Sequence, residues 1–340
     1  MAKSQNKKLM FGWVLLAILF IISATGFYIL WNGTIFGTKL PEFSKVAVQT
    51  FTPFSPNDKS EMTRQPAEIQ ATLEPNATPL PSVKSVCGQK EPMTILLLGI
   101  DENEQADVIR LVRVDFTQKR ILVLSIPRDF WVPVPGLGEH GITQYKINAT
   151  YGFGEYFNGK GQGVIKFSET IYANYGISFD RYAVFHFSDF EKLVDAVGGV
   201  DINLGGEIGN YDISSYHHLD GKSAREFAQM RDADNDDYRI DRQSLIISSL
   251  FQKLTLPENL VKLPGLGIQF LQEKTIISDL SLRDLTTFTC FAKVLDGDSL
   301  IIKDIPNELF TGRMLDGLYV RIPSPAATTY IQDLMINGNY

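Results

Sequence analysis

MTILLLGID, residues 93–101, is the stretch that decides the fold class. It is an apolar run that ends in a glycine and a carboxylate. A run of this length is typical of a strand buried on both faces, as at the centre of an α/β sheet. Two further strands are predicted at residues 108–114 and 121–126, and the polar residues 117–120 between them predict a hairpin turn.

Downstream of this hairpin, helix and strand patterns alternate. Helices are predicted over 164–175, 188–197, 221–230 and 241–254, and strands over 181–187 and 200–204. Ser188 is the expected N-cap of the second helix, and the Gly198-Gly199 pair its end. This alternation predicts an α/β domain with helices covering a central sheet, and it continues without a linker, so one domain over 93–340 is expected.

The N-terminal region carries the signal for compartment. Residues 10–31 contain no charged residue and are long enough to span a bilayer. Lys3, Lys7 and Lys8 precede them, so residues 1–9 are expected to stay in the cytoplasm and the domain to be extracytoplasmic. A cleaved signal peptide is the alternative, but no convincing A-x-A-like site follows the apolar run.

Residues 32–92 form a segment of different composition. Eight of the 16 prolines fall between Pro41 and Pro92, among Ser, Thr, Asn and Gln. No period of 2 or 3.6 runs through this segment, which predicts an extended extracytoplasmic stalk between the membrane anchor and the domain.

The overall charge and the cysteine content set further limits. The 340 residues carry a net charge of -7, so the chain is a poor general binder of nucleic acid, and any phosphate site must be a local group of basic residues. Cys87 and Cys290 show no metal-binding spacing. They form either a disulfide, which an extracytoplasmic location permits, or two unpaired thiols.

A first group of charged residues lies at the ends of the predicted strands. Asp101 follows the first strand, Asp107 begins the second, and Arg128 and Asp129 follow the third. Ligands of α/β folds bind at strand ends. Carboxylates suit Mg²⁺ and arginine suits phosphate, although a single Asp at a strand end is more often a cap or a solvated turn.

A second group lies in residues 231–243, RDADNDDYRIDRQ. Arg239 and Arg242 are three residues apart and share a helical face, which Gln243 joins. A helix N-terminus adds backbone N–H donors for an anion. The alternative is a surface loop whose Asp and Arg residues pair with each other. An EF-hand loop is disfavoured because Asp237 occupies the position of its required glycine.

Other catalytic classes lack their usual motifs. The four histidines show no metal-ligand spacing, and the sequence contains no G-x-S-x-G, H-E-x-x-H or P-loop motif. The serine hydrolase, zinc protease and nucleotide-binding interpretations therefore lose support.

Taken in order, seven short motifs resemble the LytR-CpsA-Psr family of cell-envelope glycopolymer transferases. They are LLGID (97–101), Asp107 with the LVRV that follows it, SIPRD (125–129), KINATY (146–151), LVDAVGGVD (193–201), LDG (219–221) and R-x-x-R-Q (239–243). The motifs span about residues 93–254, and weaker similarity continues to about residue 306. Their order and spacing make the resemblance specific, although each motif alone is short.

The resemblance implies a three-layer α/β/α sandwich with a central mixed sheet and an apolar pocket for a polyprenyl chain. By the same resemblance Asp101 and Asp107 would hold Mg²⁺, the expected cofactor, and would act in catalysis with Arg128 and Arg239. The residues expected to bind pyrophosphate are Arg128, Lys146, Arg231, Arg239, Arg242 and Gln243, with Arg242 in a supporting role. The helices over 164–175 and 189–197 are candidates for the pocket wall or, equally, for ordinary core.

One departure from the family pattern concerns Gln229, since the family usually has an Arg-x-Arg pair where this chain has Gln229-Met230-Arg231. A lost charge-assisted contact costs about 1.5–3 kcal/mol. Arg110 and Arg113 compensate for it only if their side chains point toward the mouth formed by Asp101 and Asp107.

The implied activity is Mg²⁺-dependent transfer of a glycopolymer from an undecaprenyl-pyrophosphate-linked precursor to peptidoglycan. Water as the acceptor would give pyrophosphatase activity. Asp129 and Asp101 are the two candidates for the general base. The alternative is a non-catalytic protein that binds or senses polyprenyl pyrophosphate, which the Gln229 departure favours. Transcriptional control is disfavoured because only nine residues precede the predicted anchor.

Overall fold

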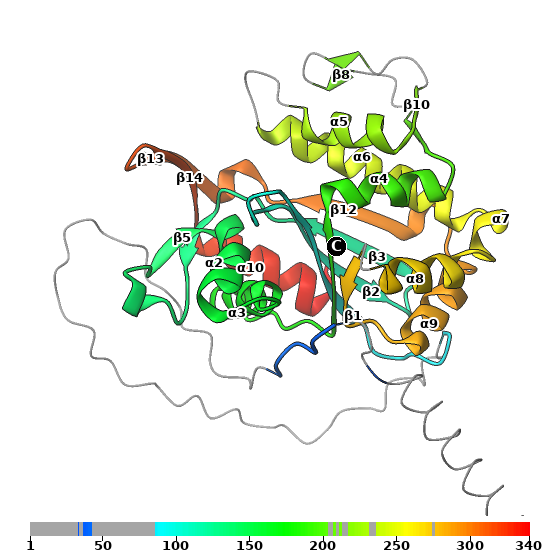
Figure 1. Ribbon diagram of the computed structural model, residues 1–340, viewed down its shortest axis with the longest axis horizontal. Coiled ribbons are helices and arrows are strands. Elements are labelled where there is room, and N and C mark those ends of the chain that lie inside the picture. The colour runs from blue at the N-terminus through cyan, green and yellow to red at the C-terminus, as the bar shows by residue number, and fades with distance from the viewer. Residues whose placement is uncertain are drawn as a thin grey trace, which may run out of the picture.

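A six-stranded mixed sheet forms the centre of the protein in this computed structural model (Figure 1). The structure describes residues 33, 37–42, 86–202, 207–208, 211–212, 217–230, 236–273 and 276–340. The strand order is β11-β6-β1-β2-β3-β12. The strands are β1 (Met93–Ile100), β2 (Ala106–Asp115), β3 (Arg120–Ser125), β6 (Arg181–His186), β11 (Ile276–Ser278) and β12 (Leu300–Asp304). β1 pairs antiparallel with β2 and parallel with β6, and β3 pairs parallel with β12.

The predicted hairpin between β2 and β3 is confirmed. Asp115 closes its turn, because one carboxylate oxygen accepts hydrogen bonds from the backbone N–H groups of Thr117 and Gln118, at 3.0 and 2.9 Å. Lys119 adopts the left-handed conformation, with φ 55°. Local side-chain bonds of this kind favour a turn over continued pairing.

One side of the sheet, here called the closed face, carries Leu96, Leu98 and Leu111, none of which has exposed surface. It packs against Phe167 of α3 and Ile331 of α10, which are also fully buried. The elements on this side are α2 (Thr150–Phe153), η3 (Gly154–Asn158), α3 (Gly163–Tyr175), α10 (Pro325–Gln332) and η6 (Asp333–Asn337). Of the two interpretations of the helix at 164–175, ordinary core is therefore the correct one.

The opposite side, here called the open face, carries Leu97, Arg110 and Val112. The strand register places Leu97 opposite both Arg110 of β2 and Ala183 of β6, and Val112 opposite Val123 of β3. Helices also lie on this side (Figure 1). They are α4 (Phe187–Ala196), α5 (Gly221–Gln229), α6 (Asp236–Thr255), α7 (Pro257–Leu260) and α8 (Leu263–Gln272). The expected α/β fold with a mixed central sheet and flanking helices is thus confirmed.

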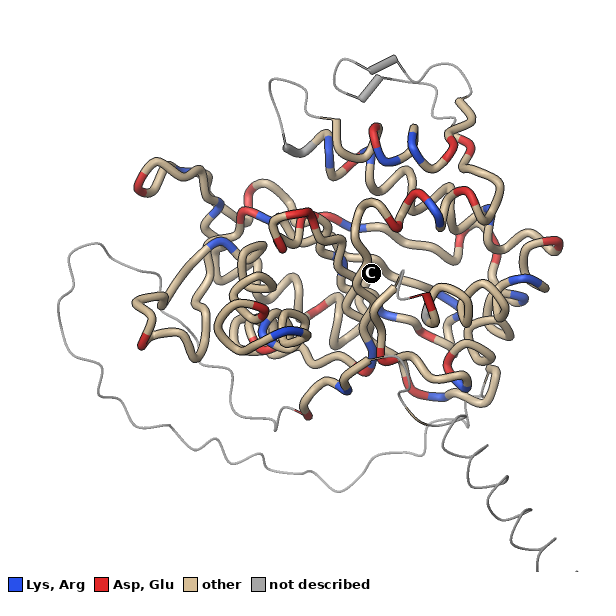
Figure 2. The backbone as a smooth tube through the Cα atoms, in the orientation of Figure 1, with Lys and Arg blue, Asp and Glu red and all other residues tan. Residues whose placement is uncertain are grey.

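Helices α4, α5 and α6 form a second apolar cluster together with β7 (Val200–Ile202). Val194, Ala224 and Ile246 meet in it and are almost fully buried. β7 pairs with β10 (His217–Leu219). Acidic and basic residues both occur along α4 and α5 (Figure 2), with three acidic residues and Lys192 on α4 and with Lys222, Arg225 and Glu226 on α5.

Two helix boundaries differ from the prediction. The helix expected from Ser188 begins at Phe187, and its N-cap position is His186, which makes no side-chain cap. Strand β6 leads directly into this helix, so no loop is left for a capping serine. Helix α6 begins at Asp236, five residues before the predicted start, so Arg239 lies in its first turn. Acidic residues favour a helix N-terminus, and the sequence interpretation had assigned them to a loop.

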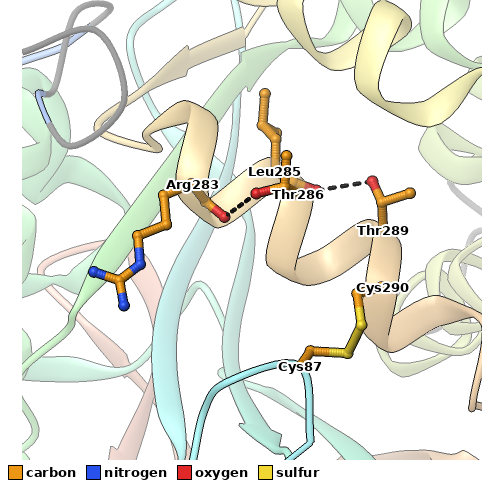
Figure 3. Close-up of a disulfide and its surroundings, with 6 residues drawn as sticks. All are labelled: Cys87, Arg283, Leu285, Thr286, Thr289 and Cys290. Carbon is orange, nitrogen blue, oxygen red and sulfur yellow. Dashed lines mark hydrogen bonds between the residues drawn. A yellow bond between two sulfur atoms is a disulfide. The ribbon is translucent and has the colours of Figure 1, made fainter. Parts of the chain in front are cut away.

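A disulfide joins Cys87 to Cys290 across 203 residues of sequence. It connects the turn before β1 to α9 (Leu282–Ala292), as Figure 3 shows. Within α9 the Thr286 and Thr289 hydroxyls each donate to a backbone carbonyl one turn earlier, at 2.8 Å. Of the two states that the sequence left open for its cysteines, the structure therefore has the disulfide.

The remaining elements are short. They are β4 (Trp131–Pro133), η1 (Gly138–His140), β5 (Gln144–Lys146), η2 (Ile147–Ala149), β8 (Glu207–Ile208), β9 (Tyr211–Asp212), η4 (Gly297–Ser299), η5 (Asn307–Leu309), β13 (Phe310–Leu315) and β14 (Leu318–Pro323). Antiparallel pairs are formed by β4 with β5 and by β13 with β14.

Near the N-terminus, Leu40 packs into the core of the domain and is 6% exposed. None of the helices that the structure describes is both long and apolar enough to cross a membrane. The span predicted over residues 10–31 lies outside the described residues, as does most of the predicted stalk.

Candidate functional site

A β-bulge at the start of β2 aims the Asp107 side chain. The β1–β2 register places Gly99 opposite Val108 but Ile100 opposite Ala106, so Asp107 is the extra residue. Bulges redirect side chains and occur often beside active sites. Gly99 fits this position because a Cβ there would lie only 2.9 Å from the Val108 Cβ.

Two arginines from distant parts of the sequence converge on Asp107. Arg128, three residues beyond β3, places Nη1 at 2.7 Å from Asp107 Oδ1. Arg239, in the first turn of α6, places Nη1 at 3.9 Å from Asp107 Oδ2. All three side chains are largely buried, with 18%, 5% and 13% of the Arg128, Arg239 and Asp107 side chains exposed. Low exposure strengthens these interactions, because water screens them less.

The charged group extends toward β5 through Asp129. Its carboxylate forms an ion pair with Lys146 Nζ and lies 3.8 Å from Arg128 Nε. The backbone fixes this arrangement, since the N–H of Ile147 donates to the carbonyl of Phe130 at 2.7 Å. Lys146 and Arg128 are therefore neighbours, as the sequence motifs require if both bind one anion.

Arg110 lies on the open face and belongs to the same group. Its Nη2 donates to Gln243 Oε1 of α6 at 3.1 Å, and its side chain is fully buried. Burial lowers the pKa of Arg110 to about 10, with Arg239 lowering and Asp304 raising it, so the guanidinium is charged at neutral pH.

Compensation by Arg110 and Arg113 is expected only if both side chains point toward Asp101 and Asp107, and Arg113 does not meet this condition. Arg113 Nη1 donates to the carbonyl of Met335 at 2.9 Å, on the closed face, and so points away. The sequence signal that separates them is strand alternation. Arg110 is one residue from the fully buried Leu111 of the closed face, whereas Arg113 is two residues from it.

Arg242 and Gln229, both named in the family motifs or beside them, lie on α6 and at the end of α5. Arg242 is fully buried and donates from Nη2 to the carbonyl of Met230, so it ties α6 to the residue that follows α5. Gln229, the last residue of α5, is exposed. Arg231 lies outside the described residues.

Asp101 follows β1 and shapes the β1–β2 loop. Its Oδ1 accepts from the backbone N–H groups of Asn103 and Gln105, at 2.9 and 2.8 Å. The same loop brings Asp101 and Asp107 to adjacent strand ends, because Ile100 pairs with Ala106. Among the residues that the structure describes, no group of three or more His, Cys, Asp and Glu side chains is placed to hold a metal ion.

The site therefore consists of Arg110, Arg128, Lys146, Arg239 and Gln243 arranged around Asp107 and Asp129. Guanidinium groups bind phosphate oxygens in bidentate pairs, and backbone N–H groups at the start of α6 add further donors. In a chain with a net charge of -7, this is the local group of basic residues that a phosphate site requires.

The sequence model of the LytR_cpsA_psr family matches residues 50–336. The chain belongs to this family. Relatives include the Staphylococcus aureus protein named Regulatory protein MsrR, which is 32% identical over 183 residues, 51% of this chain and 52% of that protein. The chain thus spans about half the length of these first relatives. A longer match is to the Enterococcus faecalis polyisoprenyl-teichoic acid–peptidoglycan teichoic acid transferase TagU, 30% identical over 259 residues, which is 72% of this chain and 79% of TagU.

Solved structures of the family share the fold. Bacillus subtilis TagV has a TM-score of 0.59 and 22% identity, covering 73% of this chain and 97% of TagV. TagT bound to LIIa-WTA has a TM-score of 0.58 and 23% identity, covering 75% of this chain and 96% of TagT. At this identity the likeness establishes the fold alone.

Proposed function

We propose that this chain transfers a glycopolymer from a polyprenyl-pyrophosphate carrier to a hydroxyl of peptidoglycan. The observation that carries the proposal is the convergence of Arg128 and Arg239 on Asp107, with Arg110 and Gln243 beside them at the end of the open face. The name of the TagU relative, a teichoic acid transferase acting between a polyisoprenyl carrier and peptidoglycan, supports this class of reaction.

In the proposed reaction the acceptor oxygen attacks the phosphorus that bears the sugar. A new P–O bond forms, the bridging P–O bond to the second phosphate breaks, and polyprenyl phosphate leaves with the electron pair. The acceptor hydroxyl gives up its proton to a carboxylate. Of the two candidates, Asp129 is the one left for this role when Asp101 holds the metal. Phosphoryl transfer of this kind depends chiefly on positioning and charge neutralisation, so no covalent nucleophile is required.

The arginines would neutralise and orient the pyrophosphate. Arg128 and Arg239 are held by Asp107 before substrate arrives, so their donors are already oriented and little reorganisation is needed when charge develops. Arg110 adds a buried positive charge behind them and is positioned by Gln243. In this proposal, the positive charge of Arg110 compensates for the arginine that Gln229 replaces in this chain.

The open face suits a polyprenyl chain. Ile95, Leu97, Val112, Ala183 and Ile302 are only half-buried there, although the sheet is flanked by helices. Apolar side chains that the fold leaves incompletely covered gain stability when a hydrocarbon chain packs on them. This apolar strip approaches the charged group at Arg110, as a lipid with a pyrophosphate head requires.

We also propose Mg²⁺ as the cofactor, held by Asp101 and Asp107. Two carboxylates at adjacent strand ends fit a hard cation that takes its remaining ligands from water and phosphate, and a larger protein cage is not needed. When bound, the ion neutralises charge on the pyrophosphate oxygens.

The proposed location is extracytoplasmic, with the anchor at residues 10–31. The disulfide between Cys87 and Cys290 supports it, because such bonds persist in oxidising compartments and are rare in the cytosol.

A second candidate is a protein that binds or senses polyprenyl pyrophosphate without turnover. Gln229 favours it, since the residue is neutral where the family usually has an arginine. Release of polyprenyl phosphate distinguishes the two functions.

The test uses the full chain in detergent with a polyprenyl-pyrophosphate-linked glycan and peptidoglycan fragments, with Mg²⁺ or a chelator. We expect polyprenyl phosphate release with Mg²⁺, its loss with chelator, and its loss in Arg128→Ala. Arg283→Ala, an exposed arginine on α9, is the matched control and should keep wild-type turnover. Retained lipid binding without any release would establish the second candidate.

A further inference from the structure

A cavity of about 610 Å³ lies beside the charged site and is not used by the proposed donor. Its walls come from the β1–β2 loop, β5, the α2–η3 segment and the tip of β14. The lining residues that matter here are Glu104, Gln105, Tyr145, Lys146, Glu155 and Tyr156. Its volume lies within the range of about 300–1,000 Å³ that small-molecule sites occupy.

Aromatic rings form one side of this cavity. The Tyr145 ring lies between Trp131 and Phe153, with ring centroids at 5.6 and 5.1 Å, so its orientation is fixed by packing. Tyr156 also lines the cavity, is 82% exposed and packs edge-on against Phe157, with ring centroids 4.8 Å apart. Aromatic rings in a cavity wall offer flat apolar surfaces against which the C–H faces of a sugar can pack.

Polar groups also line the cavity. Gln105 Oε1 accepts from the Asn148 amide at 2.9 Å, which orients both side chains. The β1–β2 loop lies close against α2, since a Cβ on Gly152 would be 3.0 Å from the carbonyl oxygen of Glu104. Amide and carboxylate groups held in this way match the hydroxyl and acetamido groups of a saccharide.

The charge of the cavity indicates whether it would hold an anionic, phosphate-containing polymer or a neutral glycan. Glu104 and Glu155 line the cavity. The pKa of the nearby Tyr151 is raised, first by burial and then by the negative charges of these two glutamates. The single lining cation, Lys146, is already paired with Asp129. A negative cavity repels a phosphate-rich polymer and accepts a neutral one.

Lys146 also makes the cavity continuous with the charged site, because the same side chain lines the cavity and pairs with Asp129 beside Arg128. The cavity therefore opens next to the residues proposed to bind the pyrophosphate.

We propose that this cavity binds the acceptor, a neutral glycan of N-acetylated amino sugars, with Tyr145 and Tyr156 packing on the sugar faces. The inference rests on the proposed transferase function and assigns it an acceptor subsite, with Tyr156 as a positioning residue.

The experiment titrates the full chain in detergent with a β-1,4-linked tetrasaccharide of N-acetylated amino sugars and, separately, with oligo(glycerol phosphate). Replacing Trp13 and Trp31 by Phe leaves Trp131 as the one tryptophan, next to Tyr145, so its fluorescence reports the cavity. Tyr156→Ala is the test variant. Tyr319→Ala is the control, because its side chain and that of the lining residue Leu318 point to opposite faces of β14.

We expect the tetrasaccharide to change the Trp131 signal, Tyr156→Ala to weaken its binding by about 3- to 10-fold, and Tyr319→Ala to have no effect. In the transfer assay Tyr156→Ala should raise the KM for acceptor and leave release of polyprenyl phosphate to water unchanged. Binding of the anionic oligomer alone, of neither probe, or of the tetrasaccharide independently of Tyr156 would overturn the proposal. Tyr156-dependent binding without any turnover would refute the transferase function and leave the glycan site standing.

Discussion

Alternate residues of β1 experience very different packing. Leu96 and Leu98 on the closed face have no exposed surface, whereas Ile95 and Leu97 on the open face are only half-buried. On the closed face, Leu96 and Leu98 belong to one apolar core with residues of α3 and α10. The open face instead contains the fully buried Arg110. The closed face is thus tightly packed and should contribute most to stability. The open face is less tightly packed, and it holds a buried charge next to partly exposed apolar side chains.

The largest effect that tests this comparison is on stability. Leu98→Ala should lower the free energy of unfolding by about 3–5 kcal/mol, because it opens a cavity in a rigid core. Leu97→Ala, one residue away, should cost only about 1 kcal/mol, since its side chain is half-buried. Urea unfolding followed by circular dichroism measures both. Equal losses would mean that the two faces are packed alike.

The next effect concerns the charged centre of the open face. Arg239→Ala should reduce turnover about 100- to 1,000-fold, the loss expected for one preorganised donor to a developing charge. Turnover measurements should be made beside Arg283→Ala, with folding checked by circular dichroism. A loss below threefold in Arg239→Ala would remove this residue from the reaction.

The disulfide bears on how the open face keeps its shape. Ile95 and Val112 of the open face pack in the apolar cluster that contains Phe291 and Cys87. The disulfide should therefore stabilise the part of the open face that α9 covers. Replacing both cysteines by serine should lower the free energy of unfolding by about 2–4 kcal/mol. A reducing agent should destabilise the wild type equally and leave the double variant unchanged. If reduction has no effect on the wild type, noncovalent packing alone holds α9 in place.

A further effect, which depends on pH, lies at the sheet edge where β6 and β11 pair. Burial raises the pKa of Asp279 to about 6, although its Oδ1 accepts from the N–H of Tyr182 at 2.8 Å. The folded state therefore holds this proton more tightly than the unfolded state. Stability should fall, relative to Asp279→Asn, as pH rises from about 4 to 6 and then stay constant. The total change is about 3 kcal/mol.

Thermal unfolding of the two proteins at pH 4, 5, 6 and 7 measures this change. Asp279 bonds to the backbone of Tyr182, which belongs to the closed face. The experiment therefore also measures the free-energy cost of a negative charge on Asp279 at the edge of this face. A constant difference between wild type and Asp279→Asn across this range would contradict the raised pKa.

Much of the fold could be predicted from local patterns. The apolar run at 93–100 became β1, and the hairpin that follows it is formed by β2 and β3, because buried strands and polar turns have signatures that depend on a few adjacent residues. Errors arose where elements join without a loop, as at Ser188, or where an acidic stretch continues a helix, as at Asp236.

The candidate site was predictable as a set of residues but not as a geometry. The order of the motifs indicated Asp107, Arg128 and Arg239, yet only the bulge in β2 and the position of α6 bring them together. Arg110 and Arg113 look equivalent in sequence, and the sheet sends them to opposite faces.

Most strands and helices, the family motifs and the basic residues available for a phosphate follow from the sequence alone. The Cys87–Cys290 disulfide, the pairing of Lys146 with Asp129 and the cavity beside them emerge only in the folded chain. The two sets differ in the sequence distance over which the interactions act. Periodicity and turn chemistry act between residues a few positions apart, whereas these contacts join segments that meet only when the elements pack.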